Sequence, residues 1–161
     1  MDSNFLTGIW AYRSWYHDTN LASSADSLIF GNGYIEIGKS PLNVLTGLIY
    51  GPNNSTNPNP IDQPFSWQLQ LKGSTNLGNP ATIRFQGKGV IDGNEWIYDY
   101  VGYAVPPWQN GIDEKPSIVG SIVRAVPHPS GSVDSNGQPV IHPAGVVASW
   151  YAVKMDVGDN Y

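Results

Sequence analysis

The side chains in this sequence best suited to bind a small molecule are its indoles and phenols. An indole or phenol ring offers a flat apolar surface together with one polar group that can form a hydrogen bond. Such rings, gathered on the inner side of a fold, would form an apolar pocket suited to a flat or polycyclic ligand. The competing interpretation is that the rings only fill a hydrophobic core. The candidate pocket residues are Tyr12, Trp67, Trp96, Tyr98, Tyr100, Trp108 and Trp150.

The balance between these two interpretations differs from ring to ring. For Trp10 and Phe85 the core-filling interpretation is favoured. For Tyr12, Tyr98 and Tyr100 the two are closer, because a buried phenol hydroxyl requires a hydrogen-bond partner. Phenols that share one small interior find such partners more easily beside a ligand or water.

Carboxylates within apolar strands are candidates for catalysis, since burial raises the pKa of an acid and suits it to act as a general acid or base. Asp99 and Glu36 are the acids most embedded in apolar strand sequence, and the Tyr98 phenol is a third candidate for proton transfer. For Asp99, a surface ion pair with Arg84 or Lys88 on the facing strand is favoured. Glu36 lies between two isoleucines, so the sequence leaves open which face it occupies.

The histidines of the chain are His17, His128 and His142, and all lie in predicted loops. None is two or four residues from another, the spacing that would place two metal ligands on one face of a strand or helix. The sequence therefore predicts solvated loop histidines and no metal site. His128 and His142 would come together only if the proline-bracketed loop 127–143 folds back over one end of the fold.

Several other chemistries lack support in the sequence. There is no Gly-x-Ser-x-Gly motif, and Gly31-Asn32-Gly33 is followed by no helical pattern, so it predicts a turn or bulge rather than a phosphate loop. Cysteine is absent, which excludes disulfides and thiolate metal sites. The net charge of −5 and the lack of a basic run argue against nucleic acid as a partner. No cofactor is expected.

A hairpin predicted around Asp92-Gly93 determines which way the central rings point. Asp-Gly between two alternating runs favours a type I′ turn, because both residues tolerate a positive φ. We expect the aromatic residues after the turn to face the interior and the charged residues to face solvent. The facing pairs are Ile91–Asn94, Gly89–Trp96, Gly87–Tyr98 and Phe85–Tyr100, with Trp96, Tyr98 and Tyr100 inward and Glu95 and Asp99 outward.

The chain is expected to form one domain, residues 1–161, built from eight strands. Alternating apolar and polar residues, clearest in 65–72 and 81–91, predict strands with one buried face. Sequential antiparallel strands with turn-rich connections favour an all-β, eight-stranded antiparallel up-and-down barrel, with a two-sheet β-sandwich as the alternative. The predicted strands are 7–16, 27–38, 43–50, 65–72, 81–91, 94–104, 117–126 and 145–155.

Strand 117–126 carries apolar residues on both faces, with Ile118 and Ile122 alternating with Val119 and Val123. A barrel wall buries only one of these faces. A symmetric partner is the simplest cover for the other, so a homo-oligomer is expected.

The loop that follows strand 94–104 contains Pro106, Pro107 and Trp108. Proline limits the conformational freedom of a loop, so this segment would present Trp108 at a low cost in ordering. We expect it to cover one mouth of the barrel and cap an apolar ligand.

Gly8-Ile9-Trp10, at the start of the first predicted strand, resembles the Gly-x-Trp motif of the calycin barrels, the lipocalin and streptavidin groups. The resemblance covers the strand count and this three-residue motif. It implies that Trp10 closes one end of the barrel, with a late basic residue, Arg124 or Lys154, packed across it. Biotin is not predicted as the ligand, because the polar groups of the streptavidin pocket cannot be aligned with this chain. The possible counterparts of that pocket's tryptophans are Trp67, Trp96 and Trp150.

The first functional hypothesis is a protein that binds a small hydrophobic or aromatic molecule in an aromatic-lined barrel pocket. The alternative is a cofactor-independent cyclase, isomerase or lyase that folds an apolar substrate in the barrel and transfers a proton through Tyr, Asp or Glu. A third hypothesis is an interaction module built around strand 117–126. An inward Asp or Glu would favour the enzyme, whereas a pocket of phenols and indoles alone would favour the binder.

The expected location is cytoplasmic. Residues 1–6 show neither the charged start nor the apolar run of a signal peptide. No apolar stretch is long enough to span a bilayer.

Overall fold

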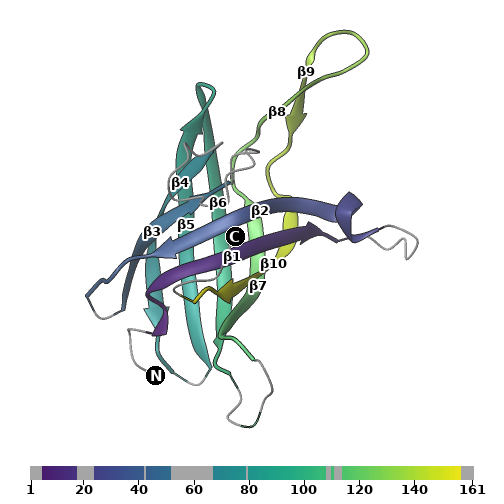
Figure 1. Ribbon diagram of the computed structural model, residues 1–161. Helices are drawn as coiled ribbons and strands as arrows, with labels where there is room; N and C mark the ends of the chain where they lie inside the picture. The colour runs from purple at the N-terminus through teal and green to yellow at the C-terminus, as the bar shows by residue number, and fades with distance from the viewer. Residues whose placement is uncertain are drawn as a thin grey trace.

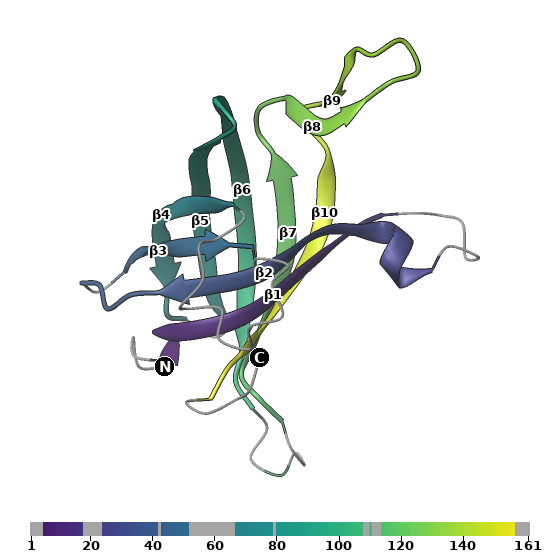
Figure 2. The same ribbon diagram turned by 45° about the horizontal axis from the view of Figure 1, so that its top comes forward.

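The protein is a closed β-barrel that carries a projecting hairpin (Figures 1 and 2). The computed structural model describes residues 5–17, 24–41, 43–51, 67–78, 80–107, 110 and 114–156. Eight antiparallel strands close in the order β1-β10-β7-β6-β5-β4-β3-β2. They are β1 (Gly8–Tyr16), β2 (Ile29–Ile37), β3 (Val44–Tyr50), β4 (Gln68–Asn76), β5 (Ala81–Ile91), β6 (Asn94–Val105), β7 (Ser117–Arg124) and β10 (Val147–Lys154).

The remaining strands, β8 (His128–Val133) and β9 (Pro139–His142), pair with each other in a separate hairpin between β7 and β10. This hairpin extends beyond the barrel wall (Figure 2). A short 3₁₀ turn, η2 (Ala25–Leu28), precedes β2. Within the described ranges, no helical segment has both the length and the apolar character needed to cross a bilayer.

The eight-stranded antiparallel barrel predicted from the sequence is confirmed, and its closure excludes the open sandwich. Two predictions of strand boundaries are wrong. The strand placed at 65–72 is Gln68–Asn76, and Phe65 lies outside the described residues. The stretch 127–143, predicted to be a loop, contains β8 and β9. Its prolines obscured the pattern, because proline is normally depleted in strands.

The register of the β5–β6 hairpin is as predicted, from Ile91 opposite Asn94 to Phe85 opposite Tyr100. Asp92 and Gly93 have φ values of 50° and 76°, as a type I′ turn requires. Tyr98 and Tyr100 are buried and Trp96 is half-buried, whereas Glu95 and Asp99 are exposed. The turn chemistry therefore fixes which residues point into the barrel.

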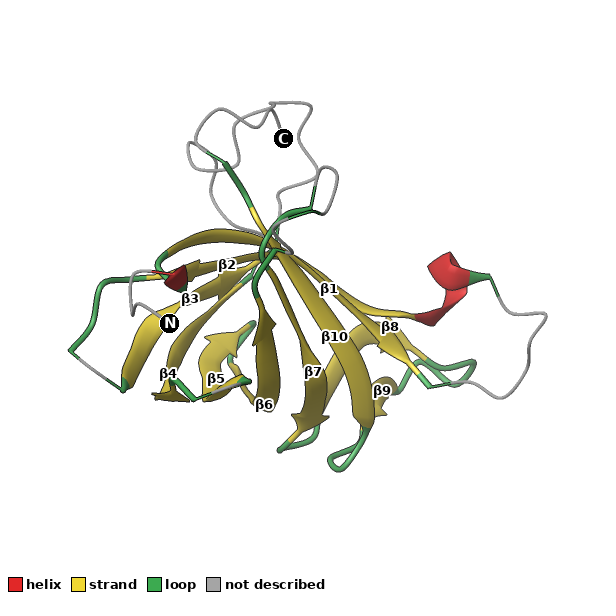
Figure 3. Ribbon diagram, turned by 90° about the horizontal axis from the view of Figure 1, so that it is seen from below, coloured by secondary structure: helices red, strands yellow, loops and turns green. Residues whose placement is uncertain are grey.

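Trp10, near the start of β1, is paired with Lys154 at the end of β10, so it lies at one end of the barrel. Figure 3 shows β1 and β10 side by side. The side chain is fully buried, and its indole Nε1 donates a hydrogen bond to the carbonyl of Leu6 at 2.9 Å. Lys154 Nζ lies 5.5 Å from the Trp10 ring and donates to the carbonyl of Phe5. Of the two basic residues considered, Lys154 therefore packs across Trp10. Arg124 lies at the last position of β7, at the other end of the barrel. We call the Trp10 end the closed end.

Strand β7 is apolar on both sides, as the sequence indicated. Ile118 and Ile122 are buried in the barrel, whereas Val119 faces outward with 40% of its surface exposed. The register places Val119 between Tyr103 of β6 and Tyr151 of β10, and both of these rings are exposed. These three residues, the outer apolar row, form a continuous patch across three strands.

Replacing Trp10 with alanine is expected to lower the free energy of unfolding by about 3–5 kcal/mol, because the change removes a fully buried aromatic ring and leaves a cavity. Urea denaturation followed by circular dichroism measures the loss. Val90→Ala, at an exposed position on β5, serves as the control and is expected to shift stability by about 0.5 kcal/mol or less. Equal midpoints for Trp10→Ala and wild type would contradict the assigned role.

Candidate functional site

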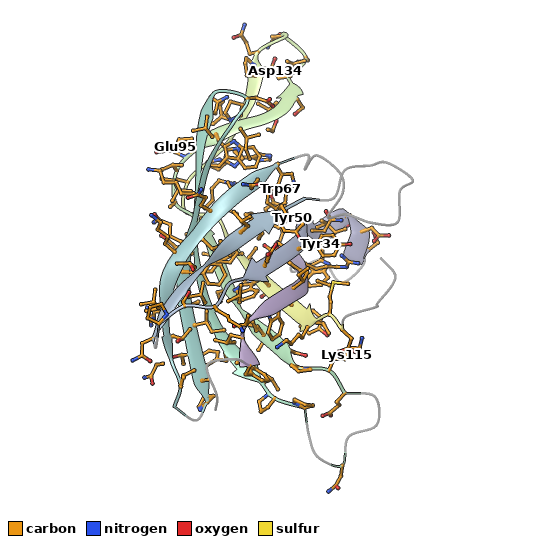
Figure 4. The ribbon with its side chains drawn as sticks, turned by 60° about the vertical axis from the view of Figure 1, so that its left-hand side comes forward. Tyr34, Tyr50, Trp67, Glu95, Lys115 and Asp134 are labelled. Carbon is orange, nitrogen blue, oxygen red and sulfur yellow. The ribbon has the colours of Figure 1, made fainter. Side chains whose placement is uncertain are left out.

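A cavity of about 320 Å³ opens at the end of the barrel opposite Trp10. Strands β1, β3, β5 and β7 end here, and β2, β4, β6 and β10 begin here. Figure 4 shows Trp67 at this end, on the side of the hairpin tip at Asp134, with Lys115 at the other end. We call it the open end. The cavity is lined by Tyr12, Ile29, Phe30, Gly31, Asn32, Trp67, Leu69, Trp96, Tyr98, Tyr100 and Ile122.

Two phenols form the inner part of the cavity. Tyr12 donates a hydrogen bond from its hydroxyl to Ser14 Oγ at 2.7 Å, and Ser14 donates to the carbonyl of Gly31 at 3.3 Å. The Tyr100 ring packs edge-on against that of Tyr12, with ring centroids 6.3 Å apart. Burial raises the pKa of the Tyr12 hydroxyl and raises that of Tyr100 well above its ordinary value. Both phenols are therefore neutral, and Ser14 supplies the hydrogen-bond partner of Tyr12.

Trp150 packs beneath these phenols and does not line the cavity. Its ring lies 6.2 Å from that of Tyr12 and 5.7 Å from that of Tyr100. Its indole Nε1 donates to the carbonyls of Val101 and Ser121, each at 3.0 Å. A Cβ at Gly102 would come within 2.6 Å of the indole, so a glycine is required there. Trp150 is therefore a core residue, contrary to its assignment to the binding site.

Phe30 enters the cavity wall from a β-bulge. Ser14 pairs with Gly31 and Trp15 pairs with Ile29, so Phe30 is the extra residue on β2. Its ring packs edge-on against those of Tyr16 and Tyr98, with distances between ring centres of 4.9 Å and 5.8 Å. A bulge redirects a side chain that regular pairing would send to the other face. The bulge thus adds an aromatic ring to the mouth of the cavity.

A phenol–imidazole pair, Tyr98 and His128, stands at the mouth beside Phe30. The Tyr98 hydroxyl lies 2.6 Å from His128 Nε2. The other ring nitrogen, Nδ1, lies 2.8 Å from the carbonyl of Pro129. A carbonyl only accepts, so Nδ1 carries the proton and Tyr98 donates to Nε2 of the neutral ring. Burial is the main cause that raises the pKa of Tyr98 and lowers that of His128.

The β8–β9 hairpin brings His128 to this position. His128 is paired with His142 in the ladder, and their rings are 5.6 Å apart. The His128 ring stacks on Trp96 at 3.7 Å with an interplanar angle of 13°. Only 3% of its surface is exposed, so the prediction of a solvated loop histidine is wrong for His128. The two histidines do converge, because their flanking segments form a hairpin at the open end.

Arg124, at the end of β7, is buried against the same cluster. Its terminal nitrogens donate to the carbonyl of Pro143 at 3.1 Å and to the Tyr16 hydroxyl at 3.4 Å. Its Cζ lies 4.9 Å from the centre of the Phe30 ring. Its Nε is buried without a hydrogen-bond partner. The guanidinium therefore lies behind Phe30 as seen from the cavity.

Five of the sequence-predicted binding residues line the cavity, and Trp108 does not fall among the described residues. The rings that line the cavity are Tyr12, Trp67, Trp96, Tyr98 and Tyr100. Pro106 and Pro107 leave β6 at the closed end. The described part of this loop, Pro106 and Pro107, therefore lies away from the cavity mouth that the loop was expected to cover.

The carboxylate candidates Asp99 and Glu36 are both exposed on the outer face of the barrel. Asp99 accepts a hydrogen bond from Gln86 at 2.9 Å, and Lys88 pairs instead with Glu95 at 2.9 Å. The outward direction predicted for Asp99 is confirmed, but its predicted ion pair with Arg84 or Lys88 is absent. Among the described residues, no Asp or Glu lines the cavity, and no cluster of three histidines or acids is placed to hold a metal ion.

Sequence reasoning missed Phe30, Arg124 and His128 as parts of one cluster. Strand alternation offered a partial indication for Arg124, which lies two residues after Ile122 and so faces inward with it. Nothing local revealed the bulge at Phe30 or the hairpin that carries His128.

Comparisons with protein-family models, with curated proteins and with solved structures find no match for this chain.

The buried histidine predicts how stability depends on pH. The pKa of His128 is lower in the folded protein than in the unfolded chain, so the unfolded state binds more protons as the pH falls through about 6.5. Stability should decrease from pH 7.5 to 5.5, with a limiting slope of about 1.4 kcal/mol per pH unit for one proton. His128→Gln should reduce this slope, as measured by urea denaturation at several pH values.

Val90→Gln provides the control for introducing a glutamine, since Val90 is exposed and does not titrate. It should keep the wild-type slope. A slope in His128→Gln as steep as in wild type would show that this histidine does not produce the pH dependence.

Proposed function

We propose that this protein binds a small, largely apolar and planar molecule in the cavity at the open end of its barrel. The observation that carries the proposal is a cavity of about 320 Å³ whose wall includes six aromatic rings (Tyr12, Phe30, Trp67, Trp96, Tyr98 and Tyr100). This volume falls within the range of small-molecule sites, which begins at about 300 Å³. The barrel shape and the Gly-x-Trp motif support a calycin-like carrier as the general type.

The wall supplies both flat apolar surface and a few polar groups. Phe30 and Tyr98 form one side of the cavity mouth, with Trp96 6.3 Å from Tyr98. Asn32 is among the lining residues, and the Tyr98 hydroxyl lies at the mouth. A flat ligand placed between these rings would exchange ordered water for aromatic contact, and a polar edge would find hydrogen-bonding groups at the mouth.

The alternative of a cofactor-independent cyclase, isomerase or lyase now rests on Tyr98 and His128. The criterion of an inward carboxylate is not met by Asp99 or Glu36, which favours binding over catalysis. The 2.6 Å contact between the Tyr98 hydroxyl and His128 is the feature that would transfer a proton to or from a bound substrate. Retention of binding together with loss of ligand conversion in Tyr98→Phe would favour the enzyme.

We also infer that the chain self-associates through the outer apolar row, Tyr103, Val119 and Tyr151. Because the barrel is closed, its eight strands leave no backbone edge for a second copy to pair with. A second copy would instead cover the exposed side chains of the outer apolar row. Light scattering of the wild type should show an oligomer at micromolar concentration. Val119→Lys should shift it to monomer, whereas Val44→Lys, exposed on β3, should not. A monomeric wild type would contradict the inference.

Binding is tested with N-phenyl-1-naphthylamine, a neutral aromatic probe that becomes fluorescent in apolar surroundings. The wild type should bind it with saturable fluorescence. Ile29→Trp places a large ring at the cavity mouth at a position that is 40% exposed, so it should weaken binding at least about tenfold without a large folding cost.

Val44→Trp is the matched control, since it adds the same ring to an exposed β-branched residue at the closed end. It should bind as the wild type does. Equal binding by all three proteins, or no saturable binding by the wild type, would overturn the assignment of the cavity.

A further inference from the structure

Arg124 is a buried cation for which the described residues supply no counter-charge. Only 3% of its surface is exposed. Its hydrogen-bond acceptors are a backbone carbonyl and the Tyr16 phenol, both uncharged, and its buried Nε has no acceptor. The ion pairs of the described residues join Lys88 to Glu95 and Lys115 to Asp156, and neither involves Arg124.

An unpaired buried cation is costly, and arginine cannot escape the cost by losing its proton. Buried charges in proteins are normally paired or bound to an ion, so one without a partner requires an explanation. The cation–π contact with Phe30 recovers part of the lost solvation. It leaves the net positive charge in place.

The neighbouring groups do not compensate for this charge. Tyr16 from β1, Phe30 from β2 and Tyr98 from β6 are neutral. His128 and His142 from the hairpin have lowered pKa values, chiefly because they are buried and also because Arg124 is positive. The cluster at the open end therefore has a positive potential at neutral pH.

The guanidinium lies one aromatic ring away from the cavity. Phe30 stacks on Arg124 and also lines the cavity. Tyr98 is paired with Arg124 across β6 and β7, is hydrogen-bonded to His128 and lines the cavity as well. Phe30 is the bulge residue, outside the pairing of β1 with β2. No described acid on the cavity wall would repel an anion.

We propose that the ligand of this cavity is an organic anion, an apolar or aromatic body with a single carboxylate, and that Arg124 provides its counter-charge. The inference rests on the proposed binding function. The apolar body occupies the cavity, and the carboxylate lies at the mouth beside Phe30 and Tyr98. There the free Nε of Arg124 acts as a hydrogen-bond donor once the Phe30 ring moves aside.

The test compares 2-naphthoate with 2-naphthamide, which share a ring system and differ in charge, by calorimetry at pH 7.5. The wild type should bind the carboxylate at least about tenfold more tightly than the amide, as expected for hydrogen bonding between charged groups. Arg124→Gln keeps an amide donor but removes the charge, and it should reduce the affinity ratio to about one. Arg84→Gln removes an exposed arginine on β5 and should leave the ratio unchanged.

A second readout uses the wild type alone, in case Arg124→Gln does not fold. In a two-dimensional ¹H–¹⁵N spectrum, the Nε–H signal of Arg124 should move on addition of 2-naphthoate and stay in place with 2-naphthamide. Equal affinity for the two compounds, a ratio that survives in Arg124→Gln, or an unmoved Arg124 signal would overturn the inference. So would failure of 2-naphthoate to bind a protein that binds N-phenyl-1-naphthylamine. Failure of all three compounds would instead refute the proposed function.

Discussion

The pairing of β1 with β10 closes the sheet, and the rest of the structure depends on this closure. The ladder runs from Trp10 opposite Lys154 to Tyr16 opposite Ala148, so the first and last strands complete the wall. Once the wall is closed, side-chain alternation divides each strand into an inner and an outer set. The inner set then fills one end of the barrel and leaves space at the other.

Each end of the barrel has a basic residue packed over an aromatic ring, but the hydrogen bonding of the two residues differs. At the closed end, Lys154 lies over Trp10 and Phe5 and donates to a backbone carbonyl. At the open end, Arg124 lies over Phe30 but is buried with one donor unused. A cation over an aromatic ring stabilises the packing in both places. At the open end this arrangement stands beside the cavity of about 320 Å³, which is why we assign the ligand's charge to that end.

The barrel and most of the aromatic rings of the cavity wall could be predicted from the sequence, because both depend on local rules. Asp92-Gly93 determined its own turn, and alternation then determined that Tyr98 and Tyr100 face inward. The features that sequence reasoning missed depend on contacts between distant segments. The bulge at Phe30 is defined by its partner strand, and the burial of His128 depends on stacking against Trp96. Trp150 was predicted to line the pocket but packs in the core, because a core ring and a pocket ring share the same inward alternation.

The central claim, that the open-end cavity holds the ligand, is tested most directly by following the indole N–H signals of the tryptophans in a ¹H–¹⁵N spectrum during titration with N-phenyl-1-naphthylamine. The signals of Trp67 and Trp96, which line the cavity, should shift in a saturable way. The signal of Trp10, buried at the closed end, should stay in place. A shift at Trp10 with none at Trp67 and Trp96 would show that the ligand does not occupy the open-end cavity.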